Sequence, residues 1–116
     1  MRHQSENKKF GREKGQRNAF LKSLLSNLIL KEKINTTETR AKEIKRRVER
    51  LVTMAKKQNI ASLRILISRV SKKPAMKLYN DIAPRYADRK GGYTRIIKLG
   101  KRRVGDASNI CTIEFI

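Results

Sequence analysis

The excess of basic residues constrains this chain more than any other feature of its sequence. Thirty lysines and arginines stand against ten acids in 116 residues, so the formal net charge is +20 at pH 7. Self-repulsion of this size opposes a compact state, and a bound polyanion relieves it while releasing its own counterions. Solubility alone requires much less charge. The sequence therefore predicts a binding protein whose partner is a polyanion.

Length and hydropathy predict how the chain is organised. We expect one domain over residues 1–116, with an extended basic arm over 1–9 and a folded body over 10–116. No apolar run is long enough for a membrane span, and no signal peptide of the usual kind follows Met1. The basic residues are spread over the whole chain, which argues against a membrane as the polyanion. The single cysteine, Cys111, excludes an internal disulfide framework and favours a reducing compartment.

Apolar residues recur at spacings of three and four in several segments, as is typical of amphipathic helices. We expect helices over residues 12–31, 38–57, 60–70 and 74–83. Thr37 and Asn59 are suited to cap the second and third of these helices. Pro74 fits the first turn of the last helix, and Pro84 should end that helix at Ala83.

Three shorter segments are typical of strands. They are residues 32–36, 93–99 and 109–116. The last two are close in sequence, so we expect them to pair in antiparallel fashion. The predicted fold is α+β, in the order helix, strand, three helices and two strands. A small mixed three-stranded sheet would pack on the helices.

The stretch from Pro84 to Ile96 joins the last expected helix to the last two expected strands, and it is crowded with cations. Gly91 and Gly92 would let backbone N–H groups approach a ligand or form a tight turn. Tyr86 and Tyr93 flank this turn and are expected to offer ring faces. Cations, exposed amides and aromatic planes together suit a folded polyanion. A solvated basic loop is the plainer interpretation of this stretch by itself.

Two clusters form the candidate RNA-binding site. The arm and the first helix contribute Arg2, His3, Lys8, Lys9, Arg12 and Arg17. The loop and the hairpin contribute Arg85, Arg89, Lys90, Gly91, Gly92, Tyr93, Thr94, Arg95, Lys101, Arg102 and Arg103. An extended basic arm beside a basic helix can follow an irregular RNA surface and fold as it binds.

Catalytic and metal-binding patterns are missing from the sequence. The single histidine, His3, and the single cysteine, Cys111, lie far apart, whereas a metal site needs several such ligands. The acids are scattered, and Glu43 with Arg47 and Glu49 with Arg46 are spaced to form ion pairs on a helix. No Walker loop or dinucleotide fingerprint occurs. We therefore expect no enzyme, no cofactor, no metal and no small-molecule substrate.

DNA is the alternative polyanion. Three consecutive helices within residues 38–83 can imitate a helix-turn-helix unit, but the turn at Gln58-Asn59 lacks the glycine often found there. Neither flanking helix presents an obvious set of base-reading residues. A DNA-binding architectural or regulatory protein is thus the main rival to an RNA-binding protein, and a small nuclease is a more distant one.

Motifs along the whole chain resemble, in order and spacing, the bacterial-type large-subunit ribosomal protein seventeen family. They are Met1-Arg2-His3, Lys9-Phe10-Gly11-Arg12, Ile34-Asn35-Thr36-Thr37, Ala41-Lys42-Glu43, residues 49–56, Pro84-Arg85-Tyr86, Arg89, residues 91–96 and Gly105-Asp106-Ala107. The sequence departs from the family pattern at Gln16, at Lys31-Glu32 and in the turn after Gly100, which is one residue longer through Val104.

The resemblance implies an α+β fold without catalytic activity. It also implies binding to large-subunit ribosomal RNA near the outer end of the peptide exit tunnel, with neighbouring large-subunit proteins as further partners. The expected location is the ribosome in the cytoplasm of a bacterium, and an organellar ribosome is the alternative.

Overall fold

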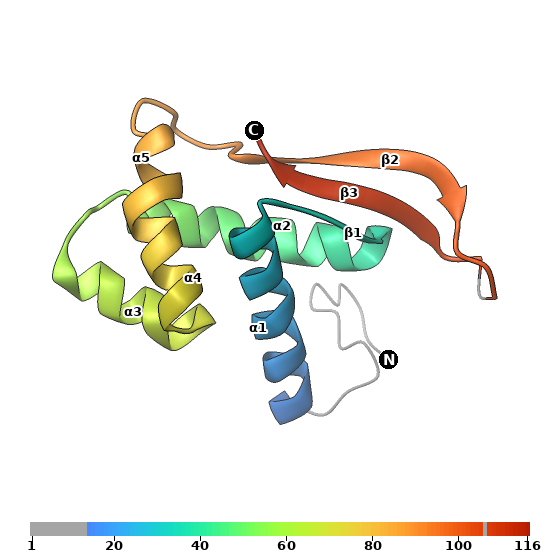
Figure 1. Ribbon diagram of the computed structural model, residues 1–116, viewed down its shortest axis with the longest axis horizontal. Helices are drawn as coiled ribbons and strands as arrows, with labels where there is room; N and C mark the ends of the chain where they lie inside the picture. Colours follow the sequence, from blue (N-terminus) through green and yellow to red (C-terminus); the bar gives the residue numbers. More distant parts are fainter. Residues whose placement is uncertain (1–13, 106) are drawn as a thin grey trace, which may run out of the picture.

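The computed structural model describes residues 14–105 and 107–116. The elements in chain order are α1 (Lys14–Lys31), β1 (Lys33–Thr37), α2 (Glu38–Ala55), α3 (Ile60–Val70), α4 (Lys72–Lys77), η1 (Leu78–Ile82), α5 (Ala83–Arg85), β2 (Thr94–Arg102) and β3 (Asn109–Phe115). This order confirms the predicted α+β fold (Figure 1). The expected arm over residues 1–9 lies outside the described residues.

The three strands form one sheet in the order β1-β3-β2. Ile113 of β3 lies between Ile34 of β1 and Ile96 of β2. The predicted antiparallel pairing of the last two strands is confirmed, but the predicted mixed sheet is wrong. Because β3 is central and runs opposite to both neighbours, each of the two pairings is antiparallel.

Helix α2 is the centre of the molecule. The sheet lies along one side of it and α1 crosses the other side, while α3, η1 and α5 pack at one end (Figure 1). Its fully buried residues Ile44, Val48 and Val52 meet Leu28 of α1 and Ile113 of β3 in one core cluster. Burial of one such side chain contributes about 1.5–3 kcal/mol. On the side of α2 that faces away from this core, Arg46 and Arg50 are exposed among the described residues.

Both predicted helix caps are confirmed. The Thr37 hydroxyl accepts a hydrogen bond from the Arg40 amide at 3.5 Å, at the start of α2. The Asn59 side chain accepts one from the Ser62 amide at 2.8 Å, at the start of α3. Each bond satisfies an amide that the first turn of a helix leaves without a backbone partner.

The helix that precedes the loop does not end at Ala83, as predicted, but continues past Pro84 to Arg85. A proline inside a helix lacks an N–H group, and its ring collides with the carbonyl four residues earlier. Here the preceding turn, η1, is widened into a π-helix, in which the Ala83 amide donates to the Leu78 carbonyl. The wider turn changes the hydrogen-bond register just before the proline, so that the helix can continue. Pro74 lies in the first turn of the segment, as predicted.

Candidate nucleic-acid interface

Three arginines, Arg46, Arg47 and Arg50, lie on the side of α2 that faces away from the core. Two of them are held by Glu43, whose side chain is only 3% exposed. Glu43 accepts hydrogen bonds from Arg46 at 3.1 and 3.2 Å and from Arg47 at 3.2 Å. One carboxylate therefore orients two guanidinium groups and leaves a net positive charge. Arg50 has no carboxylate partner within the described ranges.

The predicted pair of Glu43 with Arg47 is confirmed, but the predicted pair of Glu49 with Arg46 is wrong. Arg46 binds Glu43 instead, and Glu49 points to the sheet. Its Oε2 atom accepts from the Thr94 amide at 3.2 Å and from the Thr94 hydroxyl at 2.9 Å. Because these bonds fix the start of β2 to α2 and Thr94 is 2% exposed, the Thr94 side chain is a structural group and is not open to RNA.

A cavity of 340 Å³ lies between α2 and the loop that contains the two glycines, and we call it the glycine cavity. It is lined by Arg46, Glu49, Arg50, Thr53, Gly91 and Tyr93. Gly92 has φ of +64°, a conformation that favours glycine, and an added Cβ at Gly91 or Gly92 would meet nothing within 4 Å. The two glycines therefore have free space where a side chain would stand, and their turn lies beside the arginines of α2.

Hydrogen bonds hold the glycine loop from the inside. The Lys56 ammonium donates to the Arg89 carbonyl and, at 3.0 Å, to the Tyr93 hydroxyl. The bond from Lys56 lowers the pKa of Tyr93 below its usual value. Arg89 Nε donates to the carbonyls of Gly91 and Gly92 at 3.2 and 3.1 Å. These hydrogen bonds fix the conformation of the loop, and its two glycines and Lys90 lie at the surface.

The prediction that Tyr86 and Tyr93 offer ring faces to a ligand is wrong. Their side chains are 5% and 1% exposed, and their ring centroids lie 5.4 Å apart at an interplanar angle of 51°. The Tyr86 hydroxyl donates to the Ile116 carbonyl at 2.6 Å, and burial raises the Tyr86 pKa. The two rings close the core beneath the loop, so that neither is available to stack on a base.

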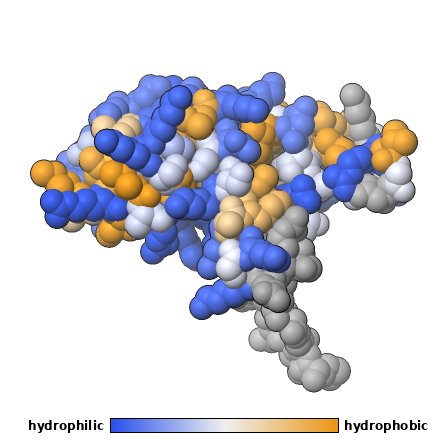
Figure 2. Space-filling model, turned by 60° about the horizontal axis from the view of Figure 1, so that its bottom comes forward, coloured by the Kyte–Doolittle hydropathy of each residue, from blue (hydrophilic) through white to orange (hydrophobic). Residues whose placement is uncertain are grey.

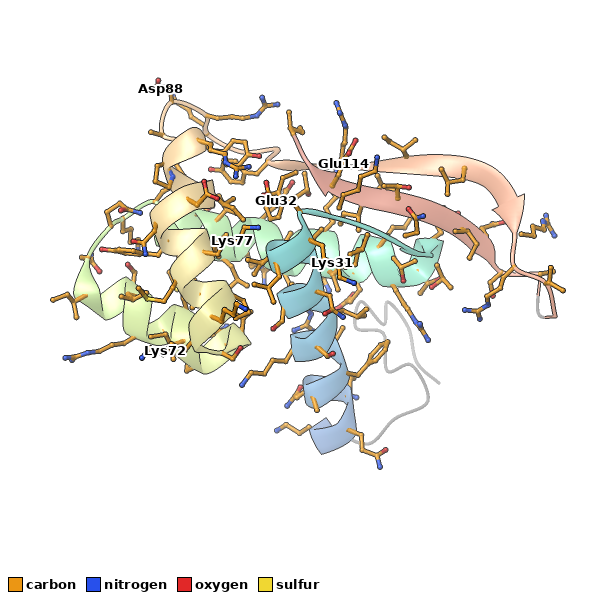
Figure 3. The ribbon with its side chains drawn as sticks, in the orientation of Figure 1. Lys31, Glu32, Lys72, Lys77, Asp88 and Glu114 are labelled. Atoms are coloured by element: carbon orange, nitrogen blue, oxygen red, sulfur yellow. The ribbon has the colours of Figure 1, made fainter. Side chains whose placement is uncertain are left out.

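Arg85 is exposed but belongs to an ion-pair cluster. It pairs with Glu32 and, at 3.0 Å, with Asp81. Lys77 lies 3.2 Å from the other oxygen of Glu32, so the cluster ties the end of α1 to the segment α4–η1–α5 (Figure 3). The hydrogen bond from Arg85 is the main cause of the lowered pKa of Glu32, and the same bond raises the pKa of Arg85.

Carboxylates also neutralise part of the hairpin. Glu114 accepts from Arg95 at 2.8 Å and lies 3.9 Å from the Lys33 ammonium. Glu38 lies 2.9 Å from Lys42 and 3.6 Å from Lys98. The hydrogen bond from Lys42 is the main cause of the lowered pKa of Glu38, and Lys98 contributes less. The exposed Arg102 has no carboxylate partner among residues 14–105 and 107–116.

The predicted site residues do not form one continuous site. Arg2, His3, Lys8, Lys9 and Arg12 lie outside the described residues. Arg89, Lys90, Gly91 and Gly92 form the glycine loop beside α2. Lys101, Arg102 and Arg103 lie at the other end of β2, where the hairpin extends beyond α2 (Figure 1). Arg17 is on α1, apart from both groups.

A second cavity, of 480 Å³, lies where α1, α2 and α3 meet, and we call it the three-helix cleft. Four cations line it: Lys22, Arg47, Arg50 and Arg69. These four residues and Arg46 were not among the predicted site residues. The spacing of Arg46, Arg47 and Arg50 opposite the apolar stripe of α2 was a usable signal for three of them. Only the tertiary fold brings Lys22 and Arg69 to the same place.

The described part of the chain shows no feature of another site class. It contains no group of three His, Cys, Asp or Glu side chains that could hold a metal ion. Burial raises the pKa of the Cys111 thiol, which disfavours the reactive thiolate. None of the described helices has both the length and the apolar character needed to cross a membrane.

Comparison of the amino-acid sequence relates this chain to known proteins. The family model for ribosomal protein L17 matches residues 20–116. A relative from Persephonella marina, called large ribosomal subunit protein bL17, is 47% identical over 118 residues that cover 100% of this chain and 95% of that protein. The protein of the same name from Hydrogenobaculum is 45% identical, and the match covers 100% of this chain and 99% of that protein. These matches confirm the resemblance noted in the sequence, and the chain belongs to the ribosomal protein L17 family.

Proposed function

We propose that this protein is a structural constituent of the large ribosomal subunit that binds and stabilises large-subunit ribosomal RNA. Its relatives carry the name of a large-subunit protein. The ribosomal protein L17 family is structural and non-enzymatic, which confirms the prediction that the chain is not an enzyme. The family resemblance further supports a position near the outer end of the peptide exit tunnel, beside neighbouring large-subunit proteins, in the ribosome of the cytoplasm or of an organelle.

The observation that carries this proposal is the uncompensated positive charge of the surface. Within residues 14–105 and 107–116, Asp88 is the only acid without a hydrogen-bond or ion-pair partner, and it lies at the tip of a loop (Figure 3). The other acids already hold cations or backbone groups. Hydrophilic side chains dominate the face drawn in Figure 2, with apolar patches between them. The cations that no described acid holds are therefore available to a partner outside the chain.

Neutralisation of phosphates is the mechanism that fits this surface. Arg46 and Arg47, oriented by Glu43, present several N–H donors on one side of α2. Arg50, which has no carboxylate partner in the described part of the chain, adds further donors there. Guanidinium groups bind phosphate oxygens in bidentate fashion, and orientation in advance lowers the entropy lost on binding. The exposed amides of the glycine turn can add uncharged donors beside them. Binding of this kind requires no base readout, which suits recognition of an RNA by its shape.

Sedimentation of a cell lysate tests the proposal against its main rival. The full-length chain should sediment with large ribosomal subunits and remain there after a high-salt wash and treatment with DNase. Recovery with DNA, and its release by DNase, would identify a DNA-binding protein instead. Cleavage of RNA by the purified chain would contradict the structural role.

A further inference from the structure

The three-helix cleft combines an apolar floor with a cationic rim. Leu21 and Leu25 of α1 and Leu51 and Met54 of α2 supply its apolar surface. The rim consists of Lys22, Arg47, Arg50 and Arg69, and no acid among residues 14–105 and 107–116 lines the cleft. Arg47 is oriented by Glu43, while the other three cations have no carboxylate partner in the described part of the chain. The cleft therefore attracts a negative group with an apolar portion.

Two uncharged polar side chains complete the lining, Asn18 from α1 and Ser68 from α3. The Ser68 hydroxyl donates to the Ile65 carbonyl at 2.6 Å, which leaves its oxygen available as an acceptor. The amide of Asn18 offers both donors and an acceptor. The polar edge of a nucleobase needs this mixture, whereas its faces need apolar or guanidinium surfaces.

We infer that the three-helix cleft binds a single unstacked nucleotide of the ribosomal RNA. Its base lies on the leucines and Met54, and its flanking phosphates meet the cationic rim. The cleft volume of 480 Å³ falls in the range of roughly 300–1,000 Å³ that is usual for pockets of single small ligands. An amphipathic helix of a neighbouring protein would need a groove for several side chains spaced along it. This inference rests on the proposed function, because it assigns a subsite to the same RNA.

Arg50 connects the cleft with the rest of the candidate interface. It lines both the three-helix cleft and the glycine cavity. An RNA strand whose nucleotide enters the cleft can therefore continue across the arginines of α2 to the amides of the glycine turn. Such a path combines one base contact with a series of backbone contacts.

A filling variant tests the cleft without removing charge. Ser68→Trp places an indole in the cleft from an exposed position of α3, and Ala61→Trp is the matched control at an exposed position of α3 that does not line the cleft. With purified large-subunit ribosomal RNA, Ser68→Trp should weaken binding about tenfold, near the low end of what one base contact contributes, and Ala61→Trp should not. Chemical probing should show one unpaired base protected by the parent chain and by Ala61→Trp but exposed with Ser68→Trp.

A pair of variants that each remove one positive charge keeps the inference testable if Ser68→Trp does not fold. Arg69→Gln and Arg64→Gln each remove one exposed arginine of α3 that has no carboxylate partner among the described residues, but only Arg69 lines the cleft. We expect Arg69→Gln to weaken RNA binding several times more than Arg64→Gln. Equal effects within each pair, with RNA binding otherwise intact, would overturn the cleft inference and leave the proposed function standing. A parent chain that does not bind the RNA would instead overturn both.

Cross-linking identifies the occupant directly. A photoreactive amino acid at position 68 of the full-length chain, incorporated into large subunits, should form an adduct with one RNA nucleotide. An adduct with a ribosomal protein would show that a protein segment fills the cleft and would overturn the inference. The absence of any adduct would do the same.

Discussion

The cluster around Glu32 and the outward side of α2 both contain arginines, but they use them differently. Arg85 lies between Glu32 and Asp81, and Lys77 shares Glu32, so these cations join two parts of the chain. On α2, the buried Glu43 serves both Arg46 and Arg47, and Arg50 has no carboxylate partner among the described residues. The comparison teaches that the position of a few acids, and not the position of the cations, decides which arginines are available to an external partner.

The largest expected effect concerns the arginines on the outward side of α2. The double variant Arg46→Gln/Arg50→Gln should weaken binding to large-subunit ribosomal RNA by on the order of tenfold per arginine, since hydrogen bonds to charged groups contribute roughly 1.5–3 kcal/mol. Arg47 remains to pair with Glu43, so the fold should persist. Filter binding at fixed salt measures the affinity. The matched control is Arg85→Gln, which should bind RNA nearly as well as the parent chain; equal losses would remove the distinction between the two regions.

The second prediction tests the acid that holds the hairpin on α2. Glu49→Ala leaves the buried amide and hydroxyl of Thr94 without their acceptor, and this should lower the free energy of unfolding by roughly 1–3 kcal/mol. Chemical denaturation measures the change. RNA affinity should not fall, because the variant removes a negative charge. A stable variant with weakened RNA binding would place Glu49 in the interface instead.

The third prediction concerns the glycine turn beside α2. Gly92→Val forces a side chain into φ of +64° and should lower the free energy of unfolding by about 1–2 kcal/mol. Gly91→Val has the same open surroundings but no such φ, so it should cost less stability. Both variants should reduce incorporation into large subunits more than Lys72→Ala, which changes an exposed residue of α4 away from the loop (Figure 3). Incorporation is measured by sedimentation, and equal incorporation of all three variants would show that the turn is not special.

The smallest expected effect belongs to the paired arginine. Arg85→Gln should lower the free energy of unfolding by about 1 kcal/mol or less near neutral pH, because its partners are partly exposed. The folded pKa of Glu32 lies below its ordinary value of 4.5, so this pair stabilises the fold above that pH and loses its effect as pH falls through the lowered pKa. The difference in stability between the parent chain and Arg85→Gln should therefore shrink in acid. A difference that is the same at pH 7 and at about pH 3 would contradict a role for the ionised Glu32.

Local patterns predicted the elements well, because each pattern acts within a few residues. The apolar stripe of α2 and the caps Thr37 and Asn59 depend on neighbours along the chain. The continuation of the helix past Pro84 was missed because a proline ordinarily ends a helix. No residue type in that stretch is a sequence signal for a π turn. The central place of β3 depends on pairing with β1, which lies far away in the sequence.

The candidate site was less predictable, since it depends on which acids and rings the fold brings together. Tyr93 is aromatic and lies in a basic loop, but its ring fills the core and its hydroxyl meets Lys56. Arg85 belongs to the same basic stretch, but it forms an ion pair with Glu32, which is distant in sequence. The arginines of α2 were visible in the sequence. Apart from Glu43, they have no acidic partner among the described residues, and this tertiary property makes them candidates for binding.

The salt dependence of RNA binding tests the central claim most directly. For the full-length chain and large-subunit ribosomal RNA, the logarithm of the affinity should fall linearly with the logarithm of the salt concentration, by about 0.7–0.9 for each phosphate contacted. Arg46→Gln/Arg50→Gln should lower this slope by about 1–2, whereas Arg85→Gln should leave it unchanged. A nearly flat dependence for the parent chain, or equal slopes for the parent chain and the double variant, would contradict the account.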